Sequence, residues 1–236
     1  MKIRVLHLYY DLMNLYGEYA NLLLLEKHLI DQGADVVIDK KTLGEKIELG
    51  KYDFIFIGEG TERNRDLVLK DLLRYKDDLI NYIEDNKYLL MTGITYEILG
   101  KSIDNNEALG IFDFRTISTK NRITSDVILK SKTFDKPTIG FINTSSKVID
   151  NENSLFQIIK ISGESEEKIN FINEGFHYKN TFGTFLTGPI LVRNPHILKY
   201  FVTNLCKEKN ENFIYNEIEY KDEQDSYNLA INELTK

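Results

Sequence analysis

Asp53-Phe-Ile-Phe-Ile57 is the stretch of this sequence that decides the fold, because it is apolar on both faces. A strand without a polar face is typical of the interior of a parallel sheet that helices cover on each side. Gly58-Glu59-Gly60 ends the stretch, a helical pattern follows from about residue 63 to 86, and Tyr88-Leu-Leu-Met91 is a second apolar run. This order predicts two neighbouring parallel strands joined by a crossover helix.

The same alternation extends toward the N-terminus. Residues 3–9 and 35–38 predict two further strands, and residues 18–32 show a helical periodicity that Gly33 ends. We therefore expect an α/β fold with a mostly parallel, doubly wound central sheet and helices on both of its faces.

The second half of the chain has a different pattern. Short strand-like pieces, separated by Gly and Asn turns, are expected at residues 110–114, 126–129, 138–142, 156–161 and 181–186. Asn194-Pro195 predicts an N-cap and first helical residue, which open a helix to about residue 207. The charged tail, 208–236, predicts one more peripheral helix at about 222–234. No linker or repeat interrupts the sequence, so we expect one domain over residues 1–236.

Composition excludes several classes of function. The net charge of −7 gives no electrostatic footprint for nucleic acid. No run of 18 or more apolar residues predicts a transmembrane segment, and the N-terminus lacks the pattern of a signal peptide. A single cysteine fits a reducing compartment. We expect a cytoplasmic protein with neither a nucleic-acid partner nor a membrane span.

Two unusual turns follow the predicted interior strands, at the edge of the sheet where α/β proteins bind ligands. Gly58-Glu59-Gly60 fits either a loop whose free N–H groups stabilise an oxyanion or a plain tight turn. Thr92-Gly93-Ile94-Thr95, which we call the elbow, has the place of a strand-to-helix turn that presents a nucleophile. Gly93 has no side chain to attack with, and a threonine hydroxyl needs an adjacent base. The two threonines are therefore interpreted as turn hydroxyls.

The remaining candidates are a histidine and the cysteine. Among four histidines, His177 alone has a plausible site position, because it precedes the glycine-rich segment 183–189. Cys206 lies at helical spacing with Phe201 and Val202, which predicts a buried structural thiol. No Cys/His cluster has metal-ligand spacing and no glycine-rich phosphate loop occurs, so we expect neither a metal nor a cofactor.

Several segments together resemble the class I glutamine amidotransferase domains of the cobyric acid synthase type, especially the glutaminase subunits of lipid II isoglutaminyl synthase. The matching segments lie in order between about residues 4 and 195. They are Leu8-Tyr-Tyr-Asp-Leu-Met-Asn-Leu-Tyr-Gly-Glu-Tyr-Ala-Asn21, Gly58-Glu-Gly-Thr-Glu-Arg63, Gly93-Ile-Thr-Tyr-Glu-Ile-Leu-Gly100, Leu109-Gly-Ile-Phe-Asp113, Gly140-Phe-Ile-Asn143, Glu174-Gly175, Gly183-Thr-Phe-Leu-Thr-Gly-Pro189 and Asn194-Pro195. The resemblance implies a flavodoxin-like fold, hydrolysis of glutamine to supply ammonia, and a Mur-ligase-like synthetase as partner.

This sequence departs from the family pattern where the family's chemistry takes place. By the resemblance, Gly93 falls on the cysteine nucleophile and Thr187 on the histidine that activates it. Glu59 replaces a glycine of the oxyanion loop. The other replacements are Ile94 and Thr95 for two glycines, Glu97 for a glutamine, and Ile142 and Thr144 for the Glu and His beside Asn143. Arg122 takes the place of the arginine that holds the glutamine carboxylate.

The concerted loss of nucleophile and base predicts a degenerate amidotransferase-like protein without glutaminase activity. It would act as a scaffold or regulatory subunit for a Mur-ligase-like partner in a complex that amidates a peptidoglycan precursor, or bind a small molecule in the former glutamine pocket. That pocket would be formed by Gly58, Glu59, Gly60, Ile94, Arg122, Asn143 and His177. The alternatives are a glutaminase subunit that works by another route, and a hydrolase with relocated residues. The latter would use Thr92 or Thr95 with His177, or Glu59 and Glu97 as a carboxylate pair.

Overall fold

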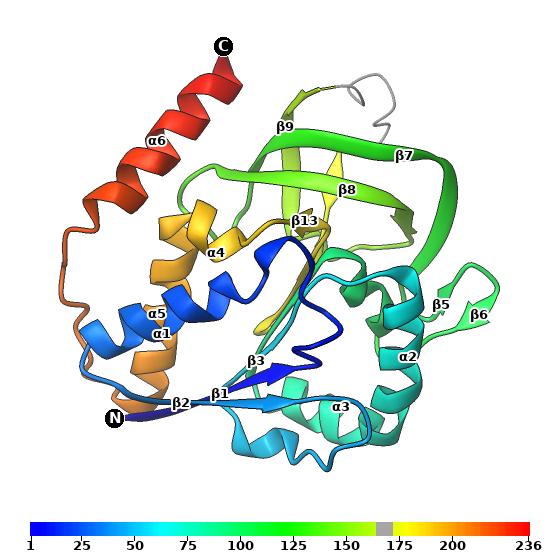
Figure 1. The fold of residues 1–236 in the computed structure, drawn as a ribbon, viewed down its shortest axis with the longest axis horizontal. Coiled ribbons are helices and arrows are strands. Elements are labelled where there is room, and N and C mark those ends of the chain that lie inside the picture. Colours follow the sequence, from blue (N-terminus) through cyan, green and yellow to red (C-terminus); the bar gives the residue numbers. More distant parts are fainter. Residues whose placement is uncertain (164–171) are drawn as a thin grey trace.

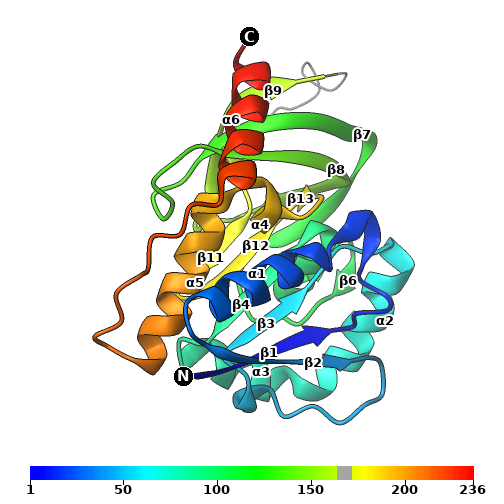
Figure 2. The ribbon, with the colours of Figure 1, turned by 60° about the vertical axis from the view of Figure 1, so that its left-hand side comes forward.

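The central sheet of the computed structural model, which describes residues 1–163 and 172–236, has six strands in the order β11-β12-β4-β3-β1-β2 (Figure 2). Their bounds are β1 Lys2–Leu8, β2 Asp35–Lys41, β3 Phe54–Ile57, β4 Tyr88–Thr92, β11 Phe176–Tyr178 and β12 Thr181–Thr184. All neighbours are parallel except β11, which pairs antiparallel with β12 at one edge. Without β11, this is the flavodoxin-like strand order, so the predicted fold is confirmed.

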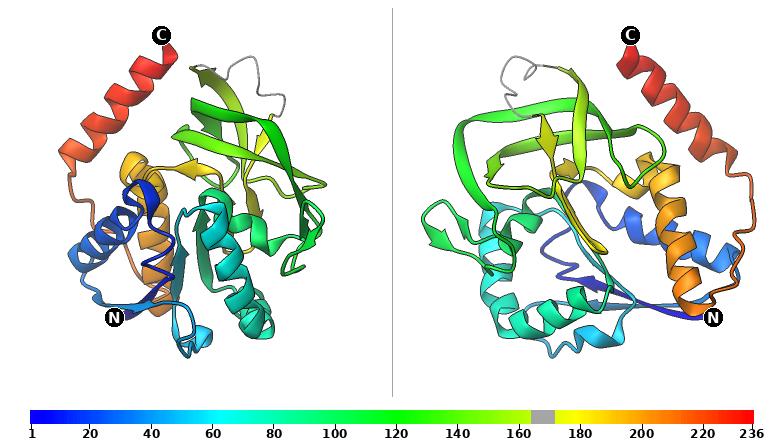
Figure 3. Two further views of the ribbon diagram at one scale, coloured as in Figure 1. Left: turned by 45° about the vertical axis from the view of Figure 1, so that its right-hand side comes forward. Right: turned by 180° about the vertical axis from the view of Figure 1, so that it is seen from behind.

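Helices cover both faces of this sheet (Figure 3). One face carries α1 Ala20–Asp31, α4 Ile190–Arg193 and α5 Pro195–Lys209, and the other carries α2 Glu62–Leu72 and α3 Lys76–Glu84. On the first face, the ring of Phe54 meets that of Phe201 from α5 edge-on, with centroids 5.4 Å apart. The four residues of β3 are all buried, which explains why the stretch is apolar on both faces.

The single helix predicted over residues 63–86 is wrong in one respect, because the structure divides it. A 3₁₀ turn, η3 Leu73–Tyr75, separates α2 from α3. Tyr75 leaves the helical region at φ −116° and ψ 16°, and its hydroxyl donates to the Glu45 carbonyl at 2.8 Å. This contact to a distant loop reorients the chain, so that α3 packs against the turn η2 Leu49–Lys51.

The second half of the chain forms a second sheet whose main strands are much longer than the short pieces that the sequence predicts. Its strands are β5 Ser102–Ile103, β6 Asn106–Glu107, β7 Arg115–Lys130, β8 Thr138–Ile149, β9 Phe156–Ser162, β10 Asn173–Glu174 and β13 Leu186–Thr187. β7 and β8 pair antiparallel along most of their length. The strand expected at 110–114 is absent, because Gly110 has φ +61° and the segment folds back onto residues 99–101.

The two sheets are joined at the carboxyl-terminal end of the first. β12 ends at Thr184, and two residues later β13 pairs antiparallel with β8. The second sheet therefore stands over the edge of the parallel sheet where the two predicted turns lie (Figures 1 and 2).

Asn194 precedes α5 and Pro195 is its first residue, as predicted, but the Asn194 side chain does not cap the helix. It accepts from the Ile139 N–H at 2.9 Å and donates to the carbonyls of Ile139 and Ile190, each at 2.9 Å. This fully buried amide thus fastens β8 to the start of α5.

The tail contains the predicted peripheral helix, α6 Lys221–Thr235, which lies beside the second sheet (Figure 2). Tyr227 packs against Ile128 and Ile139 in a small apolar cluster, and its hydroxyl donates to the Pro137 carbonyl at 2.7 Å. Within residues 1–163 and 172–236, no helix is long and apolar enough to cross a membrane.

Candidate functional site

The two turns that the sequence singles out meet at the carboxyl-terminal ends of β3 and β4. Gly58 sits against the loop before α1, since a Cβ there would lie 2.5 Å from the Met13 carbonyl oxygen and 2.9 Å from the Glu18 Cβ. Gly93 opens a 3₁₀ helix, η4 Gly93–Leu99, with φ +65°. Glycine is favoured at both positions, in one by close approach and in the other by the left-handed backbone.

The side chain of Glu59 occupies the space in front of Gly93. An ideal Cβ on Gly93 would lie 1.3 Å from Glu59 Oε2 and 2.1 Å from its Cδ. The same Oε2 accepts a hydrogen bond from the Ile94 N–H at 3.0 Å. In a nucleophile elbow, the apex carries the attacking side chain and the next N–H helps to bind the oxyanion. Here the Glu59 carboxyl group occupies the position of the attacking side chain, and it also accepts the hydrogen bond of the N–H that would bind the oxyanion.

The elbow is closed to solvent. All residues from 91 to 100 are buried, and Glu59 is only 4% exposed. Within this interior, the Thr92 hydroxyl donates to Glu18 Oε2 at 2.6 Å, and the Thr95 hydroxyl donates to the Gly58 carbonyl at 2.5 Å. Both threonines are therefore hydrogen-bonded turn residues, as the sequence analysis favours, and neither is presented to a substrate.

Three buried carboxyl groups surround the elbow. Burial, together with repulsion from Glu18 and Glu97, raises the pKa of Glu59 to about 8. Burial also raises the pKa of Glu18 to about 7, against the effect of hydrogen bonds from Thr92 and other donors. Burial likewise raises the pKa of Glu97, while Arg65, 2.5 Å from its Oε2, opposes this effect. The raised pKa favours the protonated form of the Glu59 carboxyl in the native protein.

Glu18 and Arg65 are site residues that the sequence analysis did not single out as candidates. Glu18 stands in the opening segment only as part of a family resemblance, and Arg65 falls on the polar face of a predicted helix. The only signal in the sequence is their position. Glu18 lies in the connection that follows β1, and Arg65 lies in the first turns of the helix that follows β3, so both lie near the carboxyl-terminal edge of the sheet.

Thr187 lies in β13, which pairs with β8 beside the elbow. Its side chain is buried, and its hydroxyl lies 3.3 Å from the Phe141 carbonyl. Behind it, Glu174 accepts from the Thr184 hydroxyl at 2.8 Å and from the Phe185 N–H at 2.6 Å. These contacts hold β12 and β13 in place and supply no base at residue 187.

Arg122 and Asn143, predicted as pocket residues, do come together. Arg122 Nε donates to Asn143 Oδ1 at 2.6 Å, and Asn143 Nδ2 donates to the Tyr16 hydroxyl at 3.1 Å. Arg122 and Tyr16 are exposed and Asn143 is half-buried. In the pairing of β8 with β13, Ile142 lies opposite Leu186 and Phe141 opposite Thr187, so Asn143 and its polar cluster lie just beyond the start of β13.

The sequence analysis places His177 in the pocket, but in the structure His177 lies apart from the two turns. It lies on the edge strand β11, where Nε2 is 2.8 Å from the Lys179 carbonyl and Nδ1 is 3.3 Å from the Thr133 hydroxyl. Its ring stacks on Phe182, which packs against Phe201 of α5. Burial lowers the pKa of His177. With its ring on the α5 face and both nitrogens engaged, it has no access to Glu59.

Cys206 is a free thiol buried in α5, as predicted, and burial raises its pKa to about 11. It lies on the helix that packs against Phe54, away from the carboxyl-terminal edge of the sheet. Among the described residues, no group of three or more His, Cys, Asp or Glu side chains is arranged to hold a metal ion.

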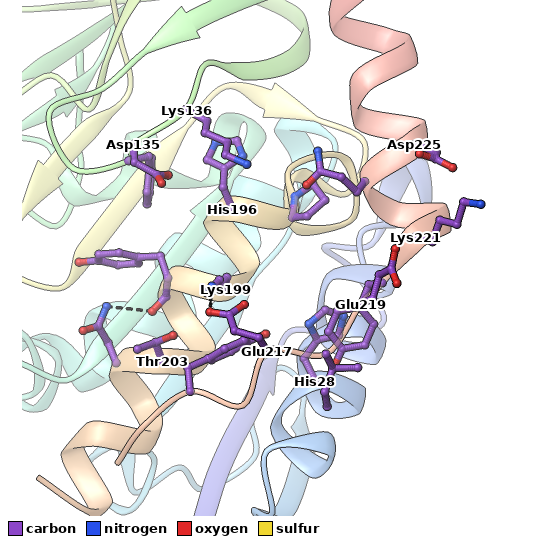
Figure 4. A pocket seen from close by; sticks show the side chains of 18 of the residues that line it. His28, Asp135, Lys136, His196, Lys199, Thr203, Glu217, Glu219, Lys221 and Asp225 are labelled. Atoms are coloured by element: carbon purple, nitrogen blue, oxygen red, sulfur yellow. Dashed lines mark hydrogen bonds and ion pairs between the residues drawn. The ribbon is translucent and has the colours of Figure 1, made fainter. Parts of the chain in front are cut away.

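Open space lies elsewhere. A groove of about 690 Å³ runs between α5 and the segment leading into α6, and Lys199 contacts Glu217 across it at 2.5 Å (Figure 4). His28 lines the other side, with its ring stacked on Tyr220 at a centroid distance of 3.8 Å. None of the predicted pocket residues lines this groove, which the sequence analysis did not find because its walls are far apart along the chain.

Known proteins share both the sequence pattern and the fold. The CobB/CobQ-like glutamine amidotransferase domain matches residues 4–195. Lipid II isoglutaminyl synthase (glutamine-hydrolyzing) subunit GatD of Streptococcus pneumoniae is 32% identical over 216 residues, covering 88% of this chain and 82% of that protein. The protein of the same name from Staphylococcus aureus is 32% identical over 227 residues, covering 92% and 90%.

Solved structures extend the likeness of fold. A glutamine amidotransferase of Thermotoga maritima has a TM-score of 0.50 at 14% identity, covering 99% of this chain and 92% of that one. A second glutamine amidotransferase has a TM-score of 0.53 at 11% identity, covering 85% and 97%. The family model, the two GatD relatives and the strand order agree, and the chain belongs to the CobB/CobQ-like glutamine amidotransferase family.

Proposed function

We propose that this chain is an amidotransferase-like subunit that does not hydrolyse glutamine, and that it acts as a scaffold or regulatory partner of a Mur-ligase-like synthetase. The single observation that carries the proposal is the position of Glu59. Its carboxyl group fills the volume of any side chain at residue 93 and takes the N–H of Ile94. A substrate carbonyl then has neither an attacking group nor a free oxyanion donor at this turn.

The rest of the site supports the same proposal. Residue 187, where the resemblance implies the activating histidine, is a threonine whose hydroxyl lies against a strand carbonyl. The elbow is buried on all sides. We interpret Gly93 and Thr187 as vestigial catalytic positions, because a thiolate and its base have been lost together while the surrounding fold is kept.

The partner class follows from the relatives. Two proteins that are 32% identical to this chain over most of its length are named as subunits of lipid II isoglutaminyl synthase. We therefore infer that this chain assembles with a Mur-ligase-like subunit of an enzyme that amidates a peptidoglycan precursor. Without glutaminase activity in this chain, the nitrogen must reach such a complex as free ammonia or from another donor.

Ammonia release from glutamine tests the proposal directly. The purified chain, alone and with its co-purified synthetase, is expected to release no ammonia above a Cys206→Ser control. Given lipid II and ATP, the complex is expected to form the amidated product with ammonium salts and not with glutamine. Glutamine-dependent release that survives Cys206→Ser and disappears in Glu59→Gln would contradict the proposal. Co-purification from the native host, followed by mass spectrometry, tests the identity of the partner. Absence of a Mur-ligase-like protein would contradict the proposed partner.

A small-molecule role for the former pocket has one observation in its favour. Arg122 and Asn143 lie together just beyond the start of β13, with the Arg122 side chain exposed. We propose that this guanidinium binds a carboxylate ligand without hydrolysing it. Calorimetric titration with glutamine and glutamate, compared between the native chain and Arg122→Met, tests this role. Equal heats from both proteins would contradict it.

The relocated-enzyme alternative has little geometric support. It requires His177 beside the elbow hydroxyls, or a water-accessible Glu59–Glu97 pair. His177 is bound on the sheet edge, and both glutamates are buried, with Glu97 held by Arg65. A hydrolase activity of the native chain that is lost in both Glu59→Gln and Glu97→Gln would support the relocated-enzyme alternative.

A further inference from the structure

A second cavity, of about 330 Å³, lies between α1 and the edge strand β2 and takes no part in the function proposed above. Residues that line it include His7, Tyr10, Tyr19, Leu23, Glu26 and Lys40. It is formed by the last residues of β1 and β2 and by the loop that follows β1. The carboxyl-terminal ends of parallel strands are where α/β sheets bind ligands, and this end is not occupied by the elbow.

Three large hydrophobic side chains in the walls of this cavity are exposed to solvent. Tyr10, Tyr19 and Leu23 are 36%, 50% and 55% exposed. Two rings and a leucine side chain around one hollow are typical of ligand sites, where apolar walls carry a few placed polar groups.

His7 is the buried polar group of this cavity. Its side chain is 3% exposed, and its Nε2 has no hydrogen-bond partner among the described residues. Burial, with a smaller effect of Lys40, lowers the pKa of His7 to about 4, so the imidazole is neutral at pH 7. Buried polar atoms in native proteins nearly always have a partner, and an unpartnered one lining a cavity indicates that something else supplies it.

Two side chains of opposite charge line the cavity. Glu26 comes from α1 and Lys40 from β2, and neither forms an ion pair within the part of the chain that the structure describes. The Lys40 ammonium lies 5.8 Å from the centroid of the Tyr10 ring. Glu26 would repel a ligand that carries only a negative charge, and Lys40 would repel one that carries only a positive charge. A ligand with both charges can pair its negative group with Lys40 and its positive group with Glu26.

We propose that this cavity binds a small zwitterion with an apolar side chain, of the size of an amino acid. Lys40 receives the carboxylate and Glu26 the ammonium group. Tyr10, Tyr19 and Leu23 cover the apolar side chain. The His7 imidazole hydrogen-bonds to the polar head of the ligand. The inference is independent of the proposed partner and of the missing glutaminase activity.

Isothermal titration of the full chain with L-leucine and with L-phenylalanine tests the proposal. The analogues 4-methylpentanoate, which lacks the amine, and 3-methylbutylamine, which lacks the carboxylate, test the need for both charges. Lys40→Met and Glu26→Gln each remove one charge at a partly or fully exposed position, so both variants are expected to fold. Lys70→Met on α2 and Glu211→Gln in the tail are matched controls outside the cavity.

The expected result is saturable binding of at least one of the two amino acids, with Kd near or below about 1 mM. Each cavity variant and each single-charge analogue weakens binding by about tenfold or more, as the loss of a charged contact predicts. The control variants leave the affinity unchanged. No saturable binding to folded native protein, equal binding of the single-charge analogues, or native affinity in both cavity variants would each overturn the proposal.

Discussion

Replacement of Gly93 by cysteine, which would place a thiol at the apex of the elbow, is expected to destabilise the protein strongly. The new Cβ would lie 1.3 Å from Glu59 Oε2, so the carboxyl must retreat by about 2 Å to reach ordinary contact distance. Glu59 is 4% exposed, so its retreat must displace neighbouring buried atoms. The retreat also breaks its hydrogen bond to the Ile94 N–H.

The magnitude follows from three contributions. A non-glycine residue at φ +65° costs about 1–2 kcal/mol. Overpacking of the interior costs about 1–3 kcal/mol. A buried polar group left without its partner costs about 1–3 kcal/mol. Gly44 supplies a matched control, since its φ is +78° and a Cβ there meets nothing within 4 Å. The backbone cost is common to both positions, so the free energy of unfolding is expected to fall about 2–6 kcal/mol further in Gly93→Cys than in Gly44→Cys.

Chemical denaturation of the two variants, and of each on a Glu59→Gly background, measures this difference. Removing the Glu59 side chain is expected to abolish most of the excess cost at residue 93 and to leave the cost at residue 44 unchanged, with a coupling of about 2 kcal/mol or more. A melting temperature lower by roughly 10 °C in Gly93→Cys than in Gly44→Cys is the thermal counterpart. If both glycines tolerate cysteine equally, or if the Gly93→Cys loss is the same with and without Glu59, the reasoning fails.

Three further predictions follow from buried groups. The native Glu59 carboxyl holds its proton up to a pKa of about 8 whereas the unfolded chain releases it near 4.5, so the free energy of unfolding should fall as pH rises from 5 to 9. In Glu59→Gln this fall should be smaller by up to about 4 kcal/mol. Urea titrations at each pH measure the free energy of unfolding of both proteins, and parallel pH profiles of the native chain and the variant would contradict the prediction. Asn194→Ala removes three hydrogen bonds to buried backbone and should cost about 2–4 kcal/mol in the same assay, with a cost below 1 kcal/mol counting against it. Cys206 should react with a thiol reagent at least about a hundredfold more slowly in the native than in the unfolded protein, because burial raises its pKa to about 11; a native rate close to the unfolded one would refute this.

The first half of the fold could be predicted from the sequence because its elements are defined by local patterns. The apolar run of β3 and the periodicity of α1 depend only on neighbouring residues, and both elements occur where expected. The break between α2 and α3 could not be predicted, because it depends on a contact from Tyr75 to Glu45, 30 residues away. The length of β7 and β8 likewise depends on their pairing with each other, which the short local patterns do not contain.

The candidate site divides in the same way. The sequence by itself determined that residue 93 has no side chain and that the only cysteine lies in a distant helix. It also predicted a pocket that contains Arg122, Asn143 and His177. In the structure, Arg122 is hydrogen-bonded to Asn143, whereas His177 lies on the edge strand β11. Periodicity assigns a residue to an element, but the face and depth at which its side chain lies depend on how the elements pack.

Only the tertiary structure decided what lies in front of Gly93. Glu59 and Gly93 are 34 positions apart, and each substitution taken alone is an ordinary change in a turn. Because β3 and β4 are adjacent parallel strands, their carboxyl-terminal turns meet, and the larger side chain of one fills the space that the other leaves. The sequence showed that residue 93 has no side chain, and the packing of two neighbouring strands determined that the space in front of it is occupied.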